Sequence, residues 1–325
     1  MAKYCVGIDL GGSFIKVGLL DEHGQAGKPI DLPTPQEGSQ AVVDQMVRGA
    51  LELMRASGVS RSDVAAIGVG SPGPLKMSDG VIIATPNIPG MNNIPIRDMI
   101  TKATGVPSVL ENDANAAGFG EYLVVSGQGV RDMVFLTLGT GVGGGIVIDG
   151  KVLHGANEVG AELGHMIVQP GGELCNCGQR GCLERYASAT FLSQRATRMI
   201  KQDGRKSSLA EALASKGSIN SKDVNEARKA GDELAAEVWD DAARCLGIAC
   251  VNIARILDPD LIVLGGGMAN AGDDILVPVR EHYHRMNWTL TEPFTKVALA
   301  RLGNDAGFVG AAGVAWQAYR EGKLK

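Results

Sequence analysis

One stretch of the sequence decides the fold: Tyr4-Cys-Val-Gly-Ile-Asp-Leu-Gly-Gly-Ser-Phe-Ile-Lys-Val-Gly-Leu-Leu20. It predicts a strand, a glycine turn at Gly11-Gly12-Ser13 and a second strand, because apolar and β-branched residues flank the small ones. The same pattern returns between Met133 and Ile148, where Val-Phe-Leu-Thr-Leu precedes a run of glycines and Gly-Ile-Val-Ile follows it. The chain therefore predicts two copies of a strand-turn-strand unit with a glycine-rich tip.

Glycine tips of this kind suit a phosphate, because missing Cβ atoms let backbone N–H groups approach an anion. Asp9 stands beside the first tip, where a carboxylate can meet a metal ion. The second tip contains G-x-G-x-x-G at Gly139, Gly141 and Gly144. A dinucleotide-binding fingerprint would open a helix, whereas these glycines lead into a strand, so that interpretation is excluded. A plain tight turn remains the alternative for either tip taken alone.

The segments between and after the two units alternate between helix and strand. Helical spacing covers Ala41 to Arg55 and Asp232 to Leu257, and the small-residue stretch Ala306 to Tyr319 predicts a final helix. Buried strands are predicted at Val64 to Val69, Val106 to Leu110 and Leu261 to Leu264, the last running into Gly265-Gly266-Gly267. Asp149-Gly150 is a type I′ turn signal that leads to a further strand, Lys151 to His154.

Asn112 and Asp113 follow the strand predicted at Val106 to Leu110. Open α/β sheets bind ligands at the carboxyl ends of their strands. The amide can orient a hydroxyl group and the carboxylate can take its proton, which is sufficient when a phosphoryl transfer needs mainly positioning and charge stabilisation. The alternative is a helix N-cap, a common use of Asp at a strand end.

Four residues have the spacing of a metal site: His165, Cys175, Cys177 and Cys182. A Cys₃His set suits tetrahedral zinc, and a closed shell of four protein ligands makes that zinc structural. A reduced thiol cluster without metal is the alternative. The other cysteines, Cys5, Cys245 and Cys250, lie in apolar patterns and are expected to be inert core thiols.

Two carboxylates flank the predicted metal loop. Glu162 lies three residues before His165, and Glu184 lies two residues after Cys182. Carboxylates accept pairs of hydrogen bonds from hydroxyl groups, as a sugar requires. Solvated loop side chains are the alternative for both.

Composition excludes several classes of protein. The chain has 325 residues, is 45% hydrophobic and carries a net charge of −5, so no general attraction to nucleic acid or an anionic membrane is expected. No apolar run reaches the length of a membrane span, and Met1 to Tyr4 leads almost directly into a strand rather than a signal sequence. A soluble cytoplasmic protein of two lobes is expected.

Seven motifs in order give the chain a specific resemblance. They are Asp9-Leu-Gly-Gly-Ser-Phe-Ile-Lys16, Gly70-Ser-Pro-Gly-Pro74, Asn112-Asp-Ala-Asn-Ala-Ala117, Leu138-Gly-Thr-Gly-Val-Gly143, Glu162-Leu-Gly-His165, Cys175-Asn-Cys-Gly-Gln-Arg-Gly-Cys-Leu-Glu184 and Leu264-Gly-Gly-Gly267. With these motifs the chain resembles the ROK family of sugar kinases and repressors. Within it the chain looks most similar to the bacterial glucokinases, through Cys182-Leu-Glu-Arg-Tyr-Ala-Ser188 and Gly303-Asn-Asp-Ala-Gly-Phe-Val-Gly-Ala-Ala312.

The resemblance implies an α/β fold of two lobes, the actin/hexokinase-like (ribonuclease H-like) ATPase fold with duplicated strand-turn-strand phosphate loops. In that fold the two hairpins grip the nucleotide phosphates. We expect a smaller lobe at 1–120 with the C-terminal helix 306–325, and a larger lobe at 121–305 with the zinc loop 165–182. Domain closure over the substrates is expected to exclude water.

The resemblance also implies roles for single residues. Asp113 would act as base toward the sugar 6-hydroxyl, and the other hydroxyl groups would be held by Asn87, Asn112, Glu162, His165 and Glu184. His165 would use one ring nitrogen on zinc and the other toward the sugar. Asp9 would help to place Mg²⁺ with ATP, and the expected nucleotide-binding residues are Gly11, Gly12, Ser13, Lys16, Thr140, Gly141, Gly266 and Gly267.

The implied activity is ATP-dependent phosphorylation of a hexose, with glucose expected to give glucose 6-phosphate. Kinases for N-acetylmannosamine, N-acetylglucosamine, fructose or allose are alternatives, because such preferences depend on pocket shape. A sugar-sensing repressor of the family would need a helix-turn-helix before the first hairpin, which here begins at Tyr4. An actin-like polymer protein would have no purpose for the zinc loop. A homodimer or homotetramer is expected by resemblance.

Overall fold

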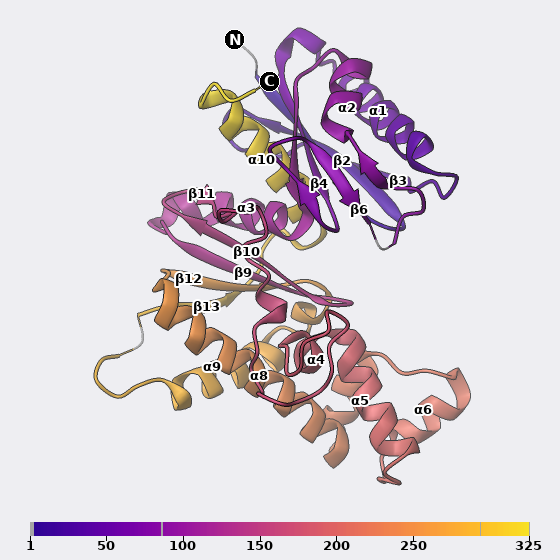
Figure 1. The fold of residues 1–325 in the computed structure, drawn as a ribbon. Coiled ribbons are helices and arrows are strands. Elements are labelled where there is room, and N and C mark those ends of the chain that lie inside the picture. The colour runs from indigo at the N-terminus through magenta and orange to yellow at the C-terminus, as the bar shows by residue number, and fades with distance from the viewer. Residues whose placement is uncertain (1–2, 86, 293, 325) are drawn as a thin grey trace. The chain divides into compact units, whose positions relative to one another are not determined.

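The computed structural model describes residues 3–85, 87–292 and 294–324, and Figure 1 shows their ribbon. The chain forms two compact units, each built from separate segments. Unit 1 comprises Met1–Val130, Gly145–Ala161 and Arg301–Lys325, and unit 2 comprises Arg131–Gly144 and Glu162–Ala300.

These units differ from the expected lobes in three segments, 121–130, 145–161 and 301–305, which belong to unit 1. A buried carboxylate explains one of them. Glu121 accepts hydrogen bonds from the backbone N–H groups of Arg301 and Leu302, both at 2.8 Å, and so fixes the chain before the last helix to unit 1. The lobes as functional bodies stay a prediction.

Unit 1 contains a five-stranded sheet of order β3-β2-β1-β4-β8. Strands β1 and β2 are antiparallel, and β1, β4 and β8 run parallel. The bounds are β1 (Tyr4–Leu10), β2 (Phe14–Asp21), β3 (Ile30–Pro33), β4 (Val64–Ser71) and β8 (Ser108–Asn112). The hairpin and the two strands predicted at Val64 to Val69 and Val106 to Leu110 are confirmed, and the second lies two residues later than predicted.

Alternate residues of β1 enter two different cores, as the two-residue period of a strand requires. Val6 and Ile8 pack with Val42 and Met46 of α1 (Ser39–Ala56), which confirms the predicted helix. Cys5 packs with apolar residues of α10 (Ala306–Arg320) instead. The sheet is therefore covered on both faces, which makes its parallel strands apolar throughout.

Helix α10 is rich in glycine and alanine because it packs closely against α3 (Asp113–Val125), β1 and β4. A Cβ atom at Gly310 would overlap the backbone carbonyl of Ala116 in α3. The remaining elements of unit 1 are α2 (Ile96–Thr104), a small sheet of β5 (Leu75–Lys76), β6 (Val81–Ala84) and β7 (Asn92–Ile94), and the 3₁₀ segments η1 (Arg61–Asp63), η2 (Ser126–Gln128) and η5 (Gly303–Asp305).

The second five-stranded sheet has the order β11-β10-β9-β12-β13, and the chain passes from unit 2 to unit 1 within β10. Its strands are β9 (Met133–Leu138), β10 (Val142–Ile148), β11 (Lys151–Val152), β12 (Leu261–Gly265) and β13 (Lys296–Leu299). Asp149 and Gly150 both have positive φ, 48° and 73°, as a type I′ turn requires. The strand after the turn ends at Val152, two residues before the predicted end.

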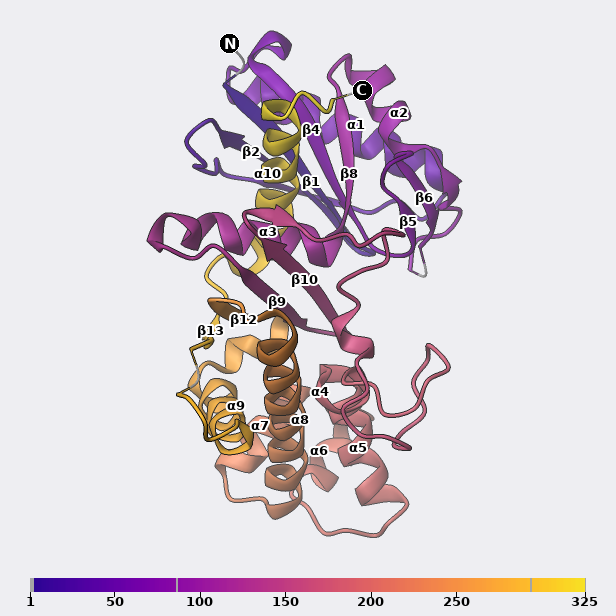
Figure 2. The ribbon, with the colours of Figure 1, turned by 60° about the vertical axis from the view of Figure 1, so that its left-hand side comes forward.

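The rest of unit 2 is mostly helical. Helix α8 (Glu233–Leu257) begins where predicted, because the side chain of Asp232 caps it by accepting the N–H of Ala235 at 2.9 Å. It packs against α7 (Ser221–Lys229) and α9 (Asp273–Met286), as Figure 2 shows. The other elements are η3 (Leu163–His165), α4 (Glu184–Ala187), α5 (Ala189–Lys201), α6 (Leu209–Lys216) and η4 (Gly267–Ala271).

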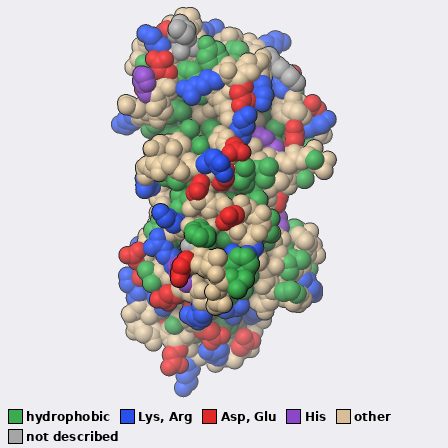
Figure 3. Space-filling view, turned by 90° about the vertical axis from the view of Figure 1, so that its left-hand side faces the viewer, with side chains coloured by type: hydrophobic (Ala, Val, Ile, Leu, Met, Phe, Trp, Pro, Cys, Tyr) green, Lys and Arg blue, Asp and Glu red, His purple; other side chains and the backbone are tan. Residues whose placement is uncertain are grey.

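The sequence predicted scattered charges and no helix that spans a membrane. On the face shown in Figure 3, acidic and basic side chains are interspersed. Among the described residues, every helix is too short or too polar to cross a bilayer.

Candidate functional site

The carboxyl ends of three strands meet at one edge of the sheet in unit 1. Asp9 of β1 pairs with Gly70 of β4, and Ser71 of β4 pairs with Asn112 of β8, all in parallel register. Asp9, Asn112 and Asp113 therefore lie at the same edge, where such sheets bind ligands.

Asn112 and Asp113 begin helix α3. The Oδ1 atom of Asn112 accepts the N–H groups of Ala114 at 2.9 Å and Asn115 at 3.1 Å, so Asn112 is the N-cap. Asp113 is the first helical residue, and its Oδ1 atom also accepts the N–H of Ala114, at 2.8 Å. The cap role considered for Asp113 thus belongs to Asn112. The cap uses only the side-chain carbonyl oxygen of Asn112. The NH₂ group of the same amide is a hydrogen-bond donor that the cap does not use.

A buried carboxylate that the sequence analysis missed supports this helix start. Glu111 is 1% exposed, and its Oε1 atom accepts the backbone N–H of Asn112 at 2.9 Å and the side-chain amide of Asn115 at 3.1 Å. Its Oε2 atom lies 2.7 Å from Nε2 of His154. This hydrogen bond raises the pKa of His154 above its usual value. A glutamate at the end of an otherwise apolar strand was the available signal.

Asp9 is partly buried at the end of β1. Burial, with the nearby charge of Asp113 as a second cause, raises its pKa to about 6, against a lowering influence of Lys16. Two carboxylates that repel each other in a partly buried place favour a bound cation, and oxygen donors suit Mg²⁺. Gly307 of α10 permits this arrangement, because a Cβ atom there would overlap the Asp9 carboxylate.

Lys16 is engaged in ion pairs within unit 1. Its Nζ atom donates to Oδ1 of Asp305 at 2.9 Å and lies 3.8 Å from Asp31. Hydrogen bonding to Asp305 raises its pKa, although its partial burial opposes this. Its predicted contact with the nucleotide stays a prediction.

The turn Gly11-Gly12-Ser13 is held from outside by Thr34, which the sequence analysis did not single out. The Thr34 hydroxyl donates to the carbonyl of Gly11 at 2.7 Å, and its N–H donates to the carbonyl of Ser13 at 2.9 Å. Asn87 lies beside the turn, since a Cβ atom on Gly12 would stand 3.2 Å from its Cβ. Unit 1 therefore brings Asn87, Asp9, Asn112, Asp113 and the first glycine turn into one neighbourhood.

The second glycine turn lies in unit 2 and is braced by Glu184. Gly139 donates its N–H to the carbonyl of Gly141 at 2.9 Å, closing the turn. Val142 then donates its N–H to Oε2 of Glu184 at 3.0 Å. A Cβ atom at Gly141 would overlap this same oxygen, so only glycine fits there with the glutamate in place. Thr140, between them, is exposed.

The third glycine cluster lies beside this turn. Strands β9 and β12 are parallel with Thr137 opposite Gly265, so Gly266 and Gly267 follow at the same sheet edge. Gly266 has φ of 79°, and a Cβ atom on it would stand 2.7 Å from backbone atoms of Leu138. The cluster that was expected to border the adenosine therefore adjoins the second glycine turn.

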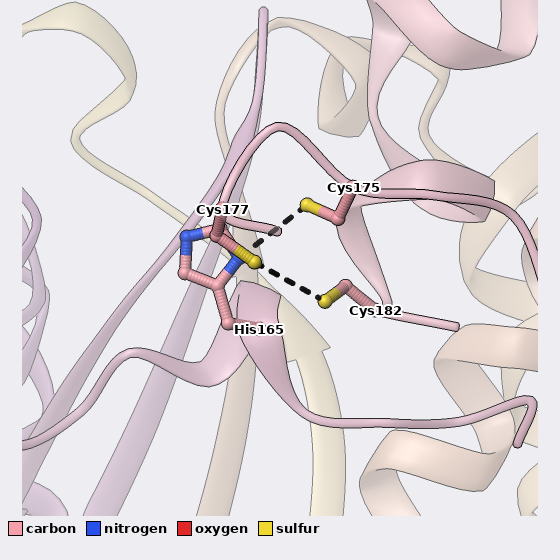
Figure 4. Close-up of side chains that lie close together, drawn as sticks. All are labelled: His165, Cys175, Cys177 and Cys182. Atoms are coloured by element: carbon pink, nitrogen blue, oxygen red, sulfur yellow. Dashed lines mark hydrogen bonds between the residues drawn. The ribbon is translucent and has the colours of Figure 1, made fainter. Parts of the chain in front are cut away.

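The four predicted metal ligands gather in unit 2, as Figure 4 shows. One donor atom from each of His165, Cys175, Cys177 and Cys182 lies within 4.8 Å of all the others. Nδ1 of His165 is 3.7 Å from Sγ of Cys175, and the Sγ atoms of Cys177 and Cys182 are also 3.7 Å apart. Three sulfurs and one imidazole nitrogen at such spacing suit tetrahedral zinc.

The thiols of this set have different surroundings. Burial raises the pKa of Cys182 to about 12 and also raises the pKa of Cys175, whereas the backbone N–H of Gln179 lowers that of Cys177 to about 7. A zinc ion would stabilise the thiolate at all three positions. The donor set therefore fits a structural zinc.

Glu184 also connects this set to the second glycine turn. Its Oε1 atom lies 3.9 Å from Sγ of Cys175, while its Oε2 atom accepts the N–H of Val142. Since His165 directs Nδ1 toward Cys175, its Nε2 atom is the nitrogen available to another partner. Glu162 is exposed, and its carbonyl accepts the N–H of His165 at 3.0 Å. Unit 2 thus places Glu162, His165 and Glu184 around one short loop.

Comparisons with known proteins cover almost the whole chain. The ROK family profile matches residues 5–318. The glucokinase of Halalkalibacterium halodurans is 39% identical over 311 residues, which are 95% of this chain and 93% of that protein. The ROK hexokinase crystal structure from Thermus thermophilus is 36% identical, with a TM-score of 0.85 over 98% of this chain and 99% of the other. A ROK family glucokinase from Streptomyces griseus, crystallised with glucose and AMPPNP, is 34% identical, with a TM-score of 0.77 over 97% and 99%.

The fold is the actin-like fold of the sugar kinases, as the duplicated glycine turns predicted. The chain belongs to the ROK family. The resemblance stated from the seven motifs is confirmed.

Proposed function

We propose that the chain is a glucokinase that transfers the γ-phosphoryl group of MgATP to the 6-hydroxyl of glucose. The observation that carries this proposal is the meeting of Asp9, the first glycine turn, Asn112 and Asp113 at the carboxyl ends of parallel strands. It is supported by glucokinase relatives at 34% and 39% identity along nearly their whole lengths.

Asp113 is the proposed general base. It stands at the first position of α3, where the cap of Asn112 and the buried Glu111 fix the backbone. A base held in this way can take the hydroxyl proton without reorganising, and phosphoryl transfer needs little more from the protein than positioning. The Asn112 NH₂ group and the nearby Asn87 are proposed to donate to sugar hydroxyls.

The other proposed sugar contacts are Glu162, His165 and Glu184. His165 would hold zinc through Nδ1 and meet a hydroxyl through Nε2, and zinc would supply a fixed position for the loop rather than chemistry. Glu184 would accept hydroxyl hydrogen bonds while it braces the second glycine turn through Val142. Loss of the loop's order should therefore weaken sugar binding.

The proposed nucleotide contacts are the backbone N–H groups of Gly11, Gly12, Ser13, Thr140 and Gly141, with Gly266 and Gly267 bordering the adenosine. Lys16 would lend charge near the phosphates. Asp9 would hold Mg²⁺, which supplies neutralisation of phosphate charge when it is bound. A cytoplasmic location, where ATP is abundant, and a homodimer or homotetramer complete the proposal.

The test is ADP release with MgATP across glucose, mannose, fructose, allose, N-acetylglucosamine and N-acetylmannosamine. A kcat/KM at least about tenfold higher for glucose than for every other sugar is expected, since pocket contacts discriminate by about 1–3 kcal/mol. A preference for an acetamido sugar would contradict the glucose assignment and keep the kinase. Sugar binding without any turnover would contradict the kinase.

A further inference from the structure

Unit 2 contains a cavity of about 570 Å³ that none of the proposed sugar, ATP or zinc contacts lines, among the described residues. Its walls come from the loop between the zinc ligands, from α4 and α5, and from α8. This volume is within the range of small-molecule sites.

The lining of the cavity is strongly basic. Five arginines line it: Arg180, Arg185, Arg195, Arg198 and Arg244. Two carboxylates face them, Glu173 and Asp241, which leaves three positive charges in excess. The whole chain carries a net charge of −5, so the local positive charge of the cavity is opposite in sign to the charge of the molecule.

The carboxylates divide four of the arginines into two groups. Glu173 lies 2.8 Å from Arg198 and 4.0 Å from Arg185. Asp241 is paired with both Arg195 and Arg244, which lower its pKa despite its burial. Each carboxylate is thus shared by two cations. The pairs hold the guanidinium groups in place and leave each group with N–H donors to spare, since each arginine has five.

Arg185 is held at the cavity wall by an aromatic ring. Its guanidinium carbon lies over the ring of Phe191, 3.6 Å from the centroid, which favours a cation–π contact. Its Nε–H is buried and has no hydrogen-bond partner among the described residues. This nitrogen is closed to solvent, so a ligand in the cavity would meet the terminal N–H groups of Arg185 instead. Arg180 adds an exposed guanidinium, held by the carbonyl of Gly172 at 3.2 Å.

We propose that this cavity binds a small metabolite with two phosphate groups, such as a sugar bisphosphate, at a site separate from the kinase site. Planar guanidinium groups recognise phosphate oxygens in pairs, and the two groups of arginines provide for two such anions. The loop between the zinc ligands forms one wall, so the bound metabolite would contact the segment that leads to Glu184.

The test is calorimetric titration of the zinc-loaded protein with fructose 1,6-bisphosphate at low ionic strength. One titration is made without other ligands, and a second is made with saturating glucose and AMPPNP, so that the kinase site is filled. We expect binding of one bisphosphate per chain. The double variant Arg180→Gln/Arg198→Gln should weaken it by about tenfold or more, as loss of charge-assisted hydrogen bonds does.

Two controls separate the site from general charge and folding. Arg205→Gln removes an exposed arginine of the same unit that pairs with Glu237 outside the cavity, and should leave the affinity unchanged. Arg180→Gln alone changes only an exposed side chain and should still weaken binding measurably if the double variant proves unstable.

Three outcomes would overturn the proposal. They are equal binding by wild type and Arg180→Gln, binding that disappears when glucose and AMPPNP are present, and no binding of fructose 1,6-bisphosphate at millimolar concentration. None depends on catalysis, so a chain that fails to phosphorylate glucose can still confirm the cavity, and an active kinase can still refute it.

Discussion

The two regions that supply the proposed sugar contacts are held in place by different means. In unit 1, Asp113 is fixed by a helix start, an N-cap and a buried glutamate, all made by backbone and side-chain hydrogen bonds. In unit 2, His165 ends the short segment η3 and Glu184 begins the short helix α4, and the irregular loop between them carries the three cysteines of the Cys₃His set. One region is fixed by secondary structure, and we expect the other to be fixed by the zinc that this donor set fits. Damage to the first should affect turnover, and damage to the second should affect stability and affinity together.

The largest effect is expected for Asp113→Asn. The variant keeps the shape of the side chain but removes the base, so kcat should fall by about 10²-fold or more with little change in glucose affinity. Steady-state kinetics and glucose titration measure the two quantities. Wild-type turnover in the variant would refute the role of Asp113.

Zinc removal should have the next largest effect, and Cys177→Ser provides it genetically. Loss of a structural metal ranks among the most damaging single changes, so the free energy of unfolding should fall by roughly 3 kcal/mol. KM for glucose should rise at the same time, because the loop carries His165 and leads to Glu184. Metal analysis, denaturant unfolding and kinetics measure these changes.

Cys250→Ala is the matched control for loss of a thiol. Cys250 is buried in α8 and far in sequence from the four ligands, so its variant should keep zinc and glucose affinity. Unchanged glucose affinity in zinc-free Cys177→Ser would contradict the dependence of the sugar contacts on the metal.

Two glycines allow a finer comparison, because each one leaves room for a proposed site carboxylate. Gly141→Ala would displace Glu184 and should raise KM for glucose, whereas Gly307→Ala would displace Asp9 and should raise KM for MgATP. We expect roughly tenfold in each case, since overpacking typically costs about 1–3 kcal/mol. Gly139→Ala, whose Cβ atom would meet open space, should leave KM for glucose unchanged. Equal increases of KM for glucose and KM for MgATP in both variants would contradict separate roles for Glu184 and Asp9.

The smallest effect concerns pH. The hydrogen bond to Glu111 raises the pKa of His154, and Glu158 adds a weaker electrostatic contribution in the same direction. The stabilisation is complete below the unfolded histidine pKa near 6.5 and is lost as pH rises through the raised folded value. The free energy of unfolding should therefore decline over this interval. In His154→Gln the decline should be absent, and an identical decline in the variant would contradict the assignment.

The features that could be predicted from the sequence are those that neighbouring residues determine. Both glycine hairpins, the long helix that begins next to Asp232 and the type I′ turn at Asp149-Gly150 follow from residue types at fixed spacing. The zinc set was predicted from residue types and spacing, because three cysteines and one histidine close together in sequence can reach one tetrahedral ion without help from distant segments. The segment from Leu209 to Lys229 folds into two helices that we did not predict, since much of their surface is polar.

The long-range contacts were beyond prediction. The bond between Glu111 and His154 joins residues 43 positions apart, and Thr34 reaches the glycine turn from 23 positions away. The arginine cavity is assembled from the zinc loop, α5 and α8, and no local pattern relates these segments. The contacts between these distant side chains depend on how the elements pack, and the periodic pattern of apolar residues carries no information about them.

The most direct test of the proposed glucokinase is identification of the product by ³¹P NMR, with wild type and Asp113→Asn incubated in parallel with MgATP and glucose. We expect the wild type to form glucose 6-phosphate and ADP in equal amounts, and the variant to form little of either over the same time. ADP release without glucose 6-phosphate, or equal product from both proteins, would contradict the proposal.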